Sequence, residues 1–73
     1  PEASGTEVVE SLQREVERVA IADKNPARRA WAWRALARAE SPAVAELYPT
    51  GLADPSPAVR TETLNALAWI VDE

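Results

Sequence analysis

Apolar side chains along this chain recur at steps of three and four residues, the spacing that places them on one face of an α-helix. Near the N-terminus one such face comprises Val9, Leu12, Val16 and Val19. Near the C-terminus a second face comprises Val59, Thr63, Ala66, Leu67 and Ile70. Few β-branched residues alternate at period two, so β-strands are not expected. The pattern therefore predicts an all-α protein.

Prolines and capping residues divide the sequence into four predicted helices, which follow a tail or linker over residues 1–4. Asn25 is a favourable N-cap, and Pro26 suits a first helical position because an N–H there would be unpaired in any case. Ser41 and Pro42 repeat this signal. The expected helices cover residues 5–22, 26–40, 42–52 and 57–71.

Local features refine these predictions at three places. Ser4 and Glu7 form a candidate capping box, in which each side chain accepts a hydrogen bond from the other residue's amide. The third helix contains Pro49 and Gly51, so we expect it to kink or fray there. Trp33 lies on the flank of the buried stripe of the second helix, and we expect it in the core.

The second half of the chain repeats the first half with an offset of 31 residues. Comparison of residues 23–37 with residues 54–68 gives seven identities in 15 positions. A period of this length that holds two helices is typical of a helical solenoid. Leu36 and Leu67 are equivalent positions in the repeat, and we expect both to be buried. Two other identical pairs are Asp23 with Asp54 and Arg29 with Arg60.

The segment 41–70, SPAVAELYPTGLADPSPAVRTETLNALAWI, resembles one HEAT or HEAT-like repeat. That family's pattern is an apolar first helix, often with a central proline, then D-x-x-x-x-V-R, then a second helix of the A-x-x-A-L-x-x-I type. The upstream copy departs from the pattern at Arg18, Arg28 and Ala39. The resemblance implies an α-solenoid fragment of two antiparallel helical hairpins, over residues 5–40 and 41–73.

The composition narrows the range of functions. The 73 residues include 15 alanines and neither Phe nor Met, so the core must form where helix backbones approach closely. Cys and His are absent, which excludes disulfides, metal sites built on these residues and imidazole catalysis. No nucleophile–base pair, metal-ligand set or phosphate-binding loop has a meaningful spacing. We therefore predict no catalytic site, no metal site and no cofactor.

The recurring Asp and Arg residues are candidates for turn structure rather than for catalysis. Each Asp can cap or brace its turn, and each Arg offers a planar fork of donors that suits carboxylates and carbonyls. In stacked repeats such residues can pair along the edge formed by the turns. Catalytic groups seldom duplicate in register with a structural repeat. The predicted turn residues are Asp23, Arg29, Asp54 and Arg60.

A partner-binding surface is predicted on the second helix of each pair, because these helices line the concave face of the solenoid in the family that the chain resembles. Trp31 and Trp69 occupy positions that are polar in the other copy. Each either packs against a missing neighbour or loop, or contacts a ligand or partner. Aromatic side chains and Arg are the types that anchor interfaces. The predicted partner-binding residues are Trp31, Arg34, Arg38, Asn65 and Trp69.

The sequence therefore predicts a non-catalytic scaffold module that binds a protein partner, further repeats of the same chain, or a second copy through its uncapped ends. Two alternatives stay open: a HEAT-like module that binds nucleic acid, and an accessory subunit of a cofactor-handling enzyme such as a bilin-lyase-like protein. The formal net charge of −4 disfavours nucleic acid.

The compartment is predicted from the absence of targeting signals. No apolar run reaches the roughly 18 residues that a membrane span requires, and no signal peptide is apparent. We therefore expect a cytoplasmic protein that does not contact membranes. Because the sequence does not begin with Met, we also expect a processed protein or a piece of a longer one.

Overall fold

Four α-helices account for most of the described residues in the structure, a computed structural model that describes residues 5–71 without the side chains at positions 6 and 7. The predicted all-α fold is confirmed for this part of the chain. The candidate capping box of Ser4 and Glu7 lies outside the described residues. The helices are α1 (Gly5–Ala22), α2 (Pro26–Arg38), α3 (Ala43–Leu52) and α4 (Pro57–Val71).

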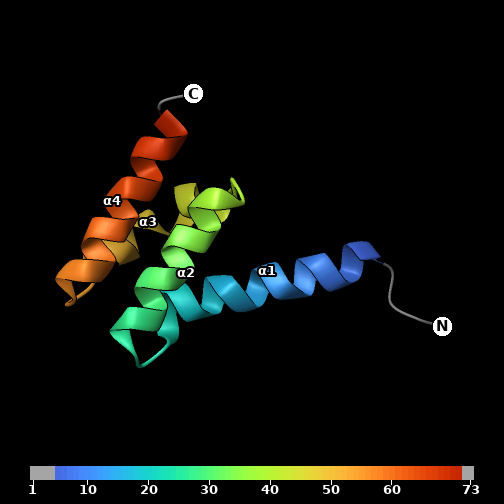
Figure 1. Cartoon of the computed structure of the whole chain (residues 1–73), viewed down its shortest axis with the longest axis horizontal. Coiled ribbons are helices and arrows are strands. Elements are labelled where there is room, and N and C mark those ends of the chain that lie inside the picture. Colours follow the sequence, from blue (N-terminus) through green and yellow to red (C-terminus); the bar gives the residue numbers. More distant parts are fainter. Residues whose placement is uncertain (1–4, 72–73) are drawn as a thin grey trace.

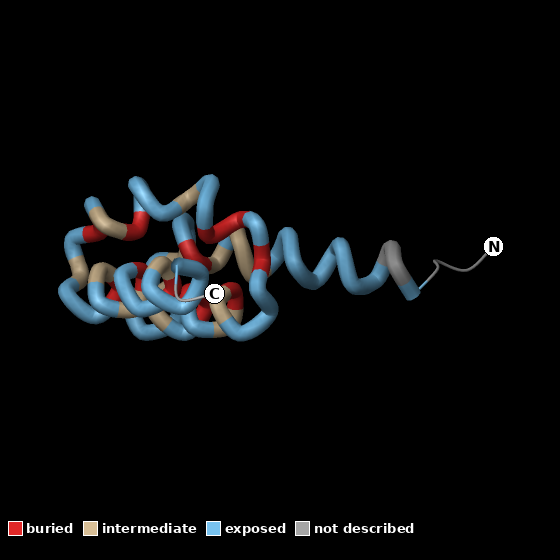
Figure 2. Tube along the Cα trace, turned by 90° about the horizontal axis from the view of Figure 1, so that it is seen from above, coloured by how far each residue is buried: buried red, intermediate tan, exposed pale blue. Residues whose placement is uncertain are grey.

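The helices are arranged around α2, which contacts the other three (Figure 1). Its most extensive contact is with α4, which lies beside it and runs in the same direction. The shorter α3 packs against α4 and runs in the opposite direction. Helices α1 and α2 diverge more than α3 and α4 do. α1 crosses α2 near the start of α2, and the N-terminal half of α1 extends away from the other helices (Figures 1 and 2).

The start of α2 follows the predicted capping pattern. The Asn25 side-chain oxygen accepts hydrogen bonds from the amides of Ala27 at 2.8 Å and Arg28 at 3.4 Å. Pro26 occupies the first helical position. Asn25 thus supplies an acceptor for two amides that have no partner within the helix. Pro26 has no N–H, so its position adds no further unpaired donor.

The end of α2 differs from the prediction, because the helix stops at Arg38 instead of Glu40. Glu40 has a left-handed φ of 52°, a conformation more usual for glycine. Its amide donates to the Ala37 carbonyl, and the Ser41 amide donates to the Leu36 carbonyl, each at 3.0 Å. These two bonds form a Schellman motif, which terminates the helix. The sequence signal was missed because a glutamate stands where the motif usually has Gly.

The predicted fraying of the third helix is wrong. α3 continues through Pro49 and Gly51 and ends at Leu52. Gly51 is buried where α3 approaches the rest of the core, and a Cβ there would lie 2.7 Å from Cζ2 of Trp33 and also clash with Oγ1 of Thr63. The glycine is therefore required for close approach between elements.

The core lies where α2, α3, α4 and the C-terminal part of α1 meet (Figure 2). Trp33 is fully buried, which confirms the prediction, and its indole N–H donates to the Ala20 carbonyl at 3.1 Å. Buried Thr63 satisfies its hydroxyl by donating to the Val59 carbonyl at 2.8 Å. The buried apolar residues are Ala20, Ala32, Trp33, Leu36, Ala43, Val44, Val59 and Ala66.

Several residues predicted to line a buried face are exposed or only half-buried. Leu36 is 2% exposed, whereas Leu67 is half-buried, so the prediction that both are buried is wrong for Leu67. Ile70 is 36% exposed in the last turn of α4. Val9 and Leu12 are exposed because their part of α1 extends beyond the other helices. The burial of a residue therefore depends on which helices pack against it as well as on the helical period.

Candidate functional site

The two turns that precede α2 and α4 have the same internal hydrogen bonds. The Asp23 carboxylate accepts from the Asn25 amide at 2.8 Å, and the Asp54 carboxylate accepts from the Ser56 amide at 2.9 Å. Arg29 Nη1 donates to the Asp23 carbonyl at 2.7 Å. Its counterpart in the second turn is a bond of 2.8 Å from Arg60 Nη1 to the Asp54 carbonyl. The repeated sequence therefore has a repeated local geometry.

A bidentate ion pair joins the first turn to the second. Arg29 donates from Nε to Asp54 Oδ2 at 2.8 Å and from Nη2 to Asp54 Oδ1 at 2.9 Å. The two side chains are 13% and 8% exposed, so the pair is largely shielded from water. The hydrogen bond from Arg29 lowers the pKa of Asp54, against the opposing effect of burial. Through these bonds Arg29 connects the two turns, while Arg60 binds within its own turn.

A groove between α2 and α4 brings together four of the five predicted partner-binding residues. Its volume is about 400 Å³, enough for one or two side chains of a partner. Asn65 and the exposed ring of Trp69 contribute from α4, and Arg34 and Arg38 contribute from α2. The complete lining is Arg34, Ala37, Arg38, Glu62, Asn65, Ala66 and Trp69.

An ion pair connects the two walls of this groove. Arg34 Nη2 donates to Glu62 Oε2 at 2.7 Å, and this hydrogen bond raises the pKa of Arg34. Arg38 has no ion-pair partner within residues 5–71. Glu62 was not predicted as a site residue, although it occupies the repeat position of Trp31. Its role becomes apparent when α2 and α4 lie side by side.

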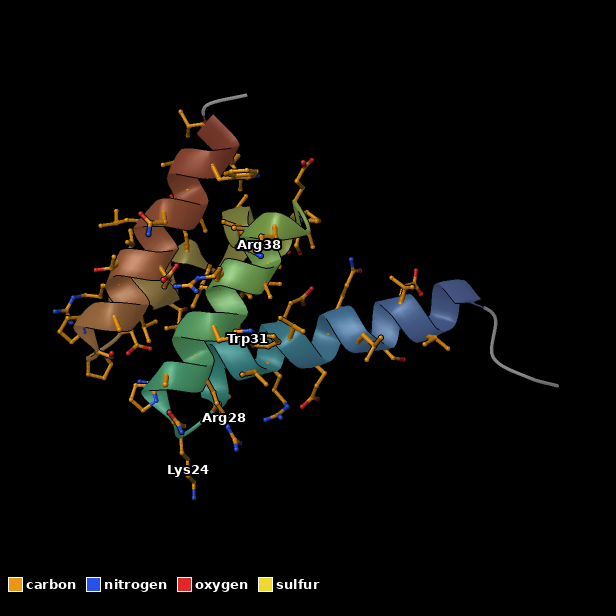
Figure 3. The ribbon with its side chains drawn as sticks, in the orientation of Figure 1. Lys24, Arg28, Trp31 and Arg38 are labelled. Carbon is orange, nitrogen blue, oxygen red and sulfur yellow. The ribbon has the colours of Figure 1, made fainter. Side chains whose placement is uncertain are left out.

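The fifth predicted residue, Trp31, does not line the groove. It is 59% exposed on α2 and lies in the angle between α2 and α1 (Figure 3). The other exposed tryptophan, Trp69, is 56% exposed and also borders a second hollow, near the turn between α2 and α3. The two rings therefore belong to separate parts of the surface.

The described part of the chain contains no group of acidic side chains arranged to hold a metal ion. Among its helices, none has the length and apolar character needed to cross a membrane. In comparisons with protein-family models, curated proteins and solved structures, this sequence has no significant match.

Proposed function

We propose that this chain is a non-catalytic protein-interaction module of HEAT-like repeats, which binds a protein partner through the face formed by α2 and α4. The observation that carries the proposal is the groove between these helices, where Trp69, Arg38 and Asn65 meet at one opening. An exposed aromatic ring, beside an amide and a guanidinium that has no ion-pair partner among the described side chains, combines a large apolar contact area with directional hydrogen bonding.

The repeated turns support the assignment to a HEAT-like repeat. Hydrogen bonds at Asp23 and Arg29 recur at Asp54 and Arg60 with nearly the same lengths, 31 residues later. The contact between α2 and α4, which run side by side, is what stacking of two second helices produces. On this proposal Asp23, Arg29, Asp54 and Arg60 maintain the scaffold, and the groove residues contact the partner.

The proposal can be tested by crosslinking followed by a binding measurement. A photo-reactive phenylalanine analogue at position 65 should form an adduct with one identifiable protein in cells. That protein, once purified, should bind the unmodified chain in titration calorimetry. Trp69→Ala should then weaken binding by about 2 kcal/mol, roughly 30-fold, because a central aromatic anchor is removed.

Leu64→Ala is the matched control, since Leu64 is also 56% exposed on α4 but does not line the groove. It should leave the affinity almost unchanged. Both variants should melt close to the parent, because both side chains are exposed. Equal losses of affinity in the two variants would show that the groove is not the binding site.

A further inference from the structure

A row of exposed side chains follows the turn before α2 and then one side of that helix. Lys24, Arg28, Trp31 and Arg38, called here the basic row, succeed one another along it (Figure 3). The spacings of three and seven residues keep Arg28, Trp31 and Arg38 on one face of α2, and Lys24 lies in the turn before it. In Figure 3, Trp31 lies on the side of α2 nearer to α1, whereas Arg38 reaches the groove between α2 and α4.

The cations of the basic row are weakly neutralised, in contrast to Arg29 and Arg34, which form close ion pairs. Within the described residues, neither Lys24 nor Arg38 has an ion-pair partner. Arg28 is 71% exposed, and its Nη1 lies 3.9 Å from the Asp23 carboxylate, too far for a hydrogen bond. By comparison, Arg29 contacts its carboxylate at 2.8 Å. An acidic protein of net charge −4 therefore has a locally positive strip.

The centre of the basic row is apolar. Trp31 is 59% exposed, and Ala35, one helical turn further on, lines an adjoining groove. The opposite wall of that groove includes Val9, Leu12 and Val16 of α1. The volume is about 310 Å³, which accommodates an apolar side chain. The row thus combines cations at its two ends with an apolar contact area between them.

We propose that the basic row binds an acidic peptide segment with one apolar side chain between its carboxylates. The apolar side chain contacts Trp31 and enters the groove at Ala35, while carboxylates flank it at Arg28 and Arg38. Arg38 lies ten positions after Arg28, a rise of about 15 Å along the helix axis. An extended peptide advances about 3.3 Å per residue, so carboxylates about four or five residues apart reach both. The inference rests on the proposed function, since it specifies the partner's chemistry.

The charge distribution favours a peptide over a nucleic acid. A phosphate backbone carries a charge at each nucleotide and would bring several of them close to the acidic residues of the same surface. Asp23 lies next to Arg28, and Glu62 is paired with Arg34 beside Arg38. A peptide can place its carboxylates at the two ends of the row and avoid these positions.

The experiment uses a defined probe, a fluorescein-labelled Gly/Ser peptide that carries one leucine between two glutamates placed about four or five residues apart. Fluorescence anisotropy should show saturable binding that weakens with added salt. Arg38→Glu should raise the Kd about tenfold or more, and Trp31→Ala should have a similar effect. Arg14→Glu is the matched control, because it makes the same charge change at an exposed arginine of α1 and should alter the Kd less than about twofold.

Four outcomes would overturn the proposal. The first two are a probe that does not bind and an equal effect of Arg14→Glu and Arg38→Glu on the Kd. The other two are a peptide with glutamine in place of glutamate that binds as tightly as the probe, and a single-stranded oligonucleotide that binds more tightly and loses its binding in Arg38→Glu and Trp31→Ala. Lys24→Glu, in the exposed turn, provides a second test if Trp31→Ala does not fold. A probe that fails to bind, while the crosslinked partner still requires Trp69, would overturn this inference and leave the proposed function intact.

Discussion

Arg29 and Arg60 occupy the same position in two turns with the same internal hydrogen bonds, but their surroundings differ. Arg29 holds the carboxylate of the following turn, whereas within residues 5–71 Arg60 has a backbone carbonyl as its partner. Burial also differs between the two copies, because Trp33 is 0% exposed and its repeat equivalent Leu64 is 56% exposed. Among the described helices, α2 lies between α1 and α4, whereas α4 lies at the edge.

This comparison separates two effects of a repeated sequence. Hydrogen bonds within a turn depend on residues that are near in sequence, so they are reproduced in both copies. Burial depends on which elements lie against a residue. α2 has α1 on one side and α4 on the other, whereas α4 packs against α2 and α3 within the described chain. The same residue type therefore contributes differently to stability in the two copies.

The largest expected difference between the copies concerns the equivalent leucines. Leu36→Ala should cost about 3–5 kcal/mol of unfolding free energy, because Leu36 is 2% exposed and its truncation leaves a cavity. Leu67→Ala should cost about 1–2 kcal/mol, because Leu67 is half-buried and already in contact with water. Urea denaturation followed by circular dichroism measures both. Equal costs would contradict the distinction between interior and edge.

A second contrast concerns Gly51 and its repeat equivalent Ala20, both of which are buried. Gly51→Ala should destabilise the fold by about 2–3 kcal/mol in spite of alanine's higher helix propensity, because the methyl group meets Trp33 and Thr63. Ala20→Gly should cost about 1 kcal/mol through helix propensity. Thermal melts of the two variants should rank them in this order.

Gly5→Ala is the control for the effect of propensity alone, since a Cβ at Gly5 would meet nothing within 4 Å. It should leave the melting temperature unchanged or raise it slightly. A double variant with Thr63→Ala should recover part of the stability lost in Gly51→Ala, because two of the clashing atoms are removed. Full stability of Gly51→Ala by itself would show that the close approach is not required.

The smallest expected difference concerns the two aspartates. Asp54→Asn should cost about 1–2 kcal/mol, because the amide can still accept from Ser56 but loses its charged, bidentate contact with Arg29. Asp23→Asn keeps its capping bond to Asn25 and should be nearly neutral. Differential scanning calorimetry at neutral pH would compare them, and equal costs would indicate that the ion pair adds nothing.

The pH dependence of the Asp54 variant sharpens the same comparison. The pKa of Asp54 is lower in the folded protein than its unfolded value of about 4. The stabilisation is therefore fully present above about pH 4 and is lost as the pH falls through the folded pKa. The difference in melting temperature between the parent and Asp54→Asn should shrink below about pH 4. A constant difference down to pH 2 would contradict this assignment.

The sequence by itself determined the local structure. Apolar periodicity, Asn25, and the prolines at positions 26 and 57 placed the helices within about two residues, since these signals act over a single turn of helix. The burial of Trp33 was also predicted from its position on the stripe. The predicted end of α2 was two residues too late, because Glu40 adopts a left-handed backbone conformation that a glutamate does not favour.

Only the tertiary structure decided how these elements combine into surfaces. The sequence predicted Arg34, Arg38, Asn65 and Trp69 as one binding face, and the groove required α2 and α4 to lie side by side. The position of Trp31 outside that groove could not be read from the helical period, because the period fixes a direction around one helix and not the neighbours it meets. The exposure of Leu67 has the same cause, since packing between helices far apart in sequence determines which equivalent residue is interior and which lies at the edge.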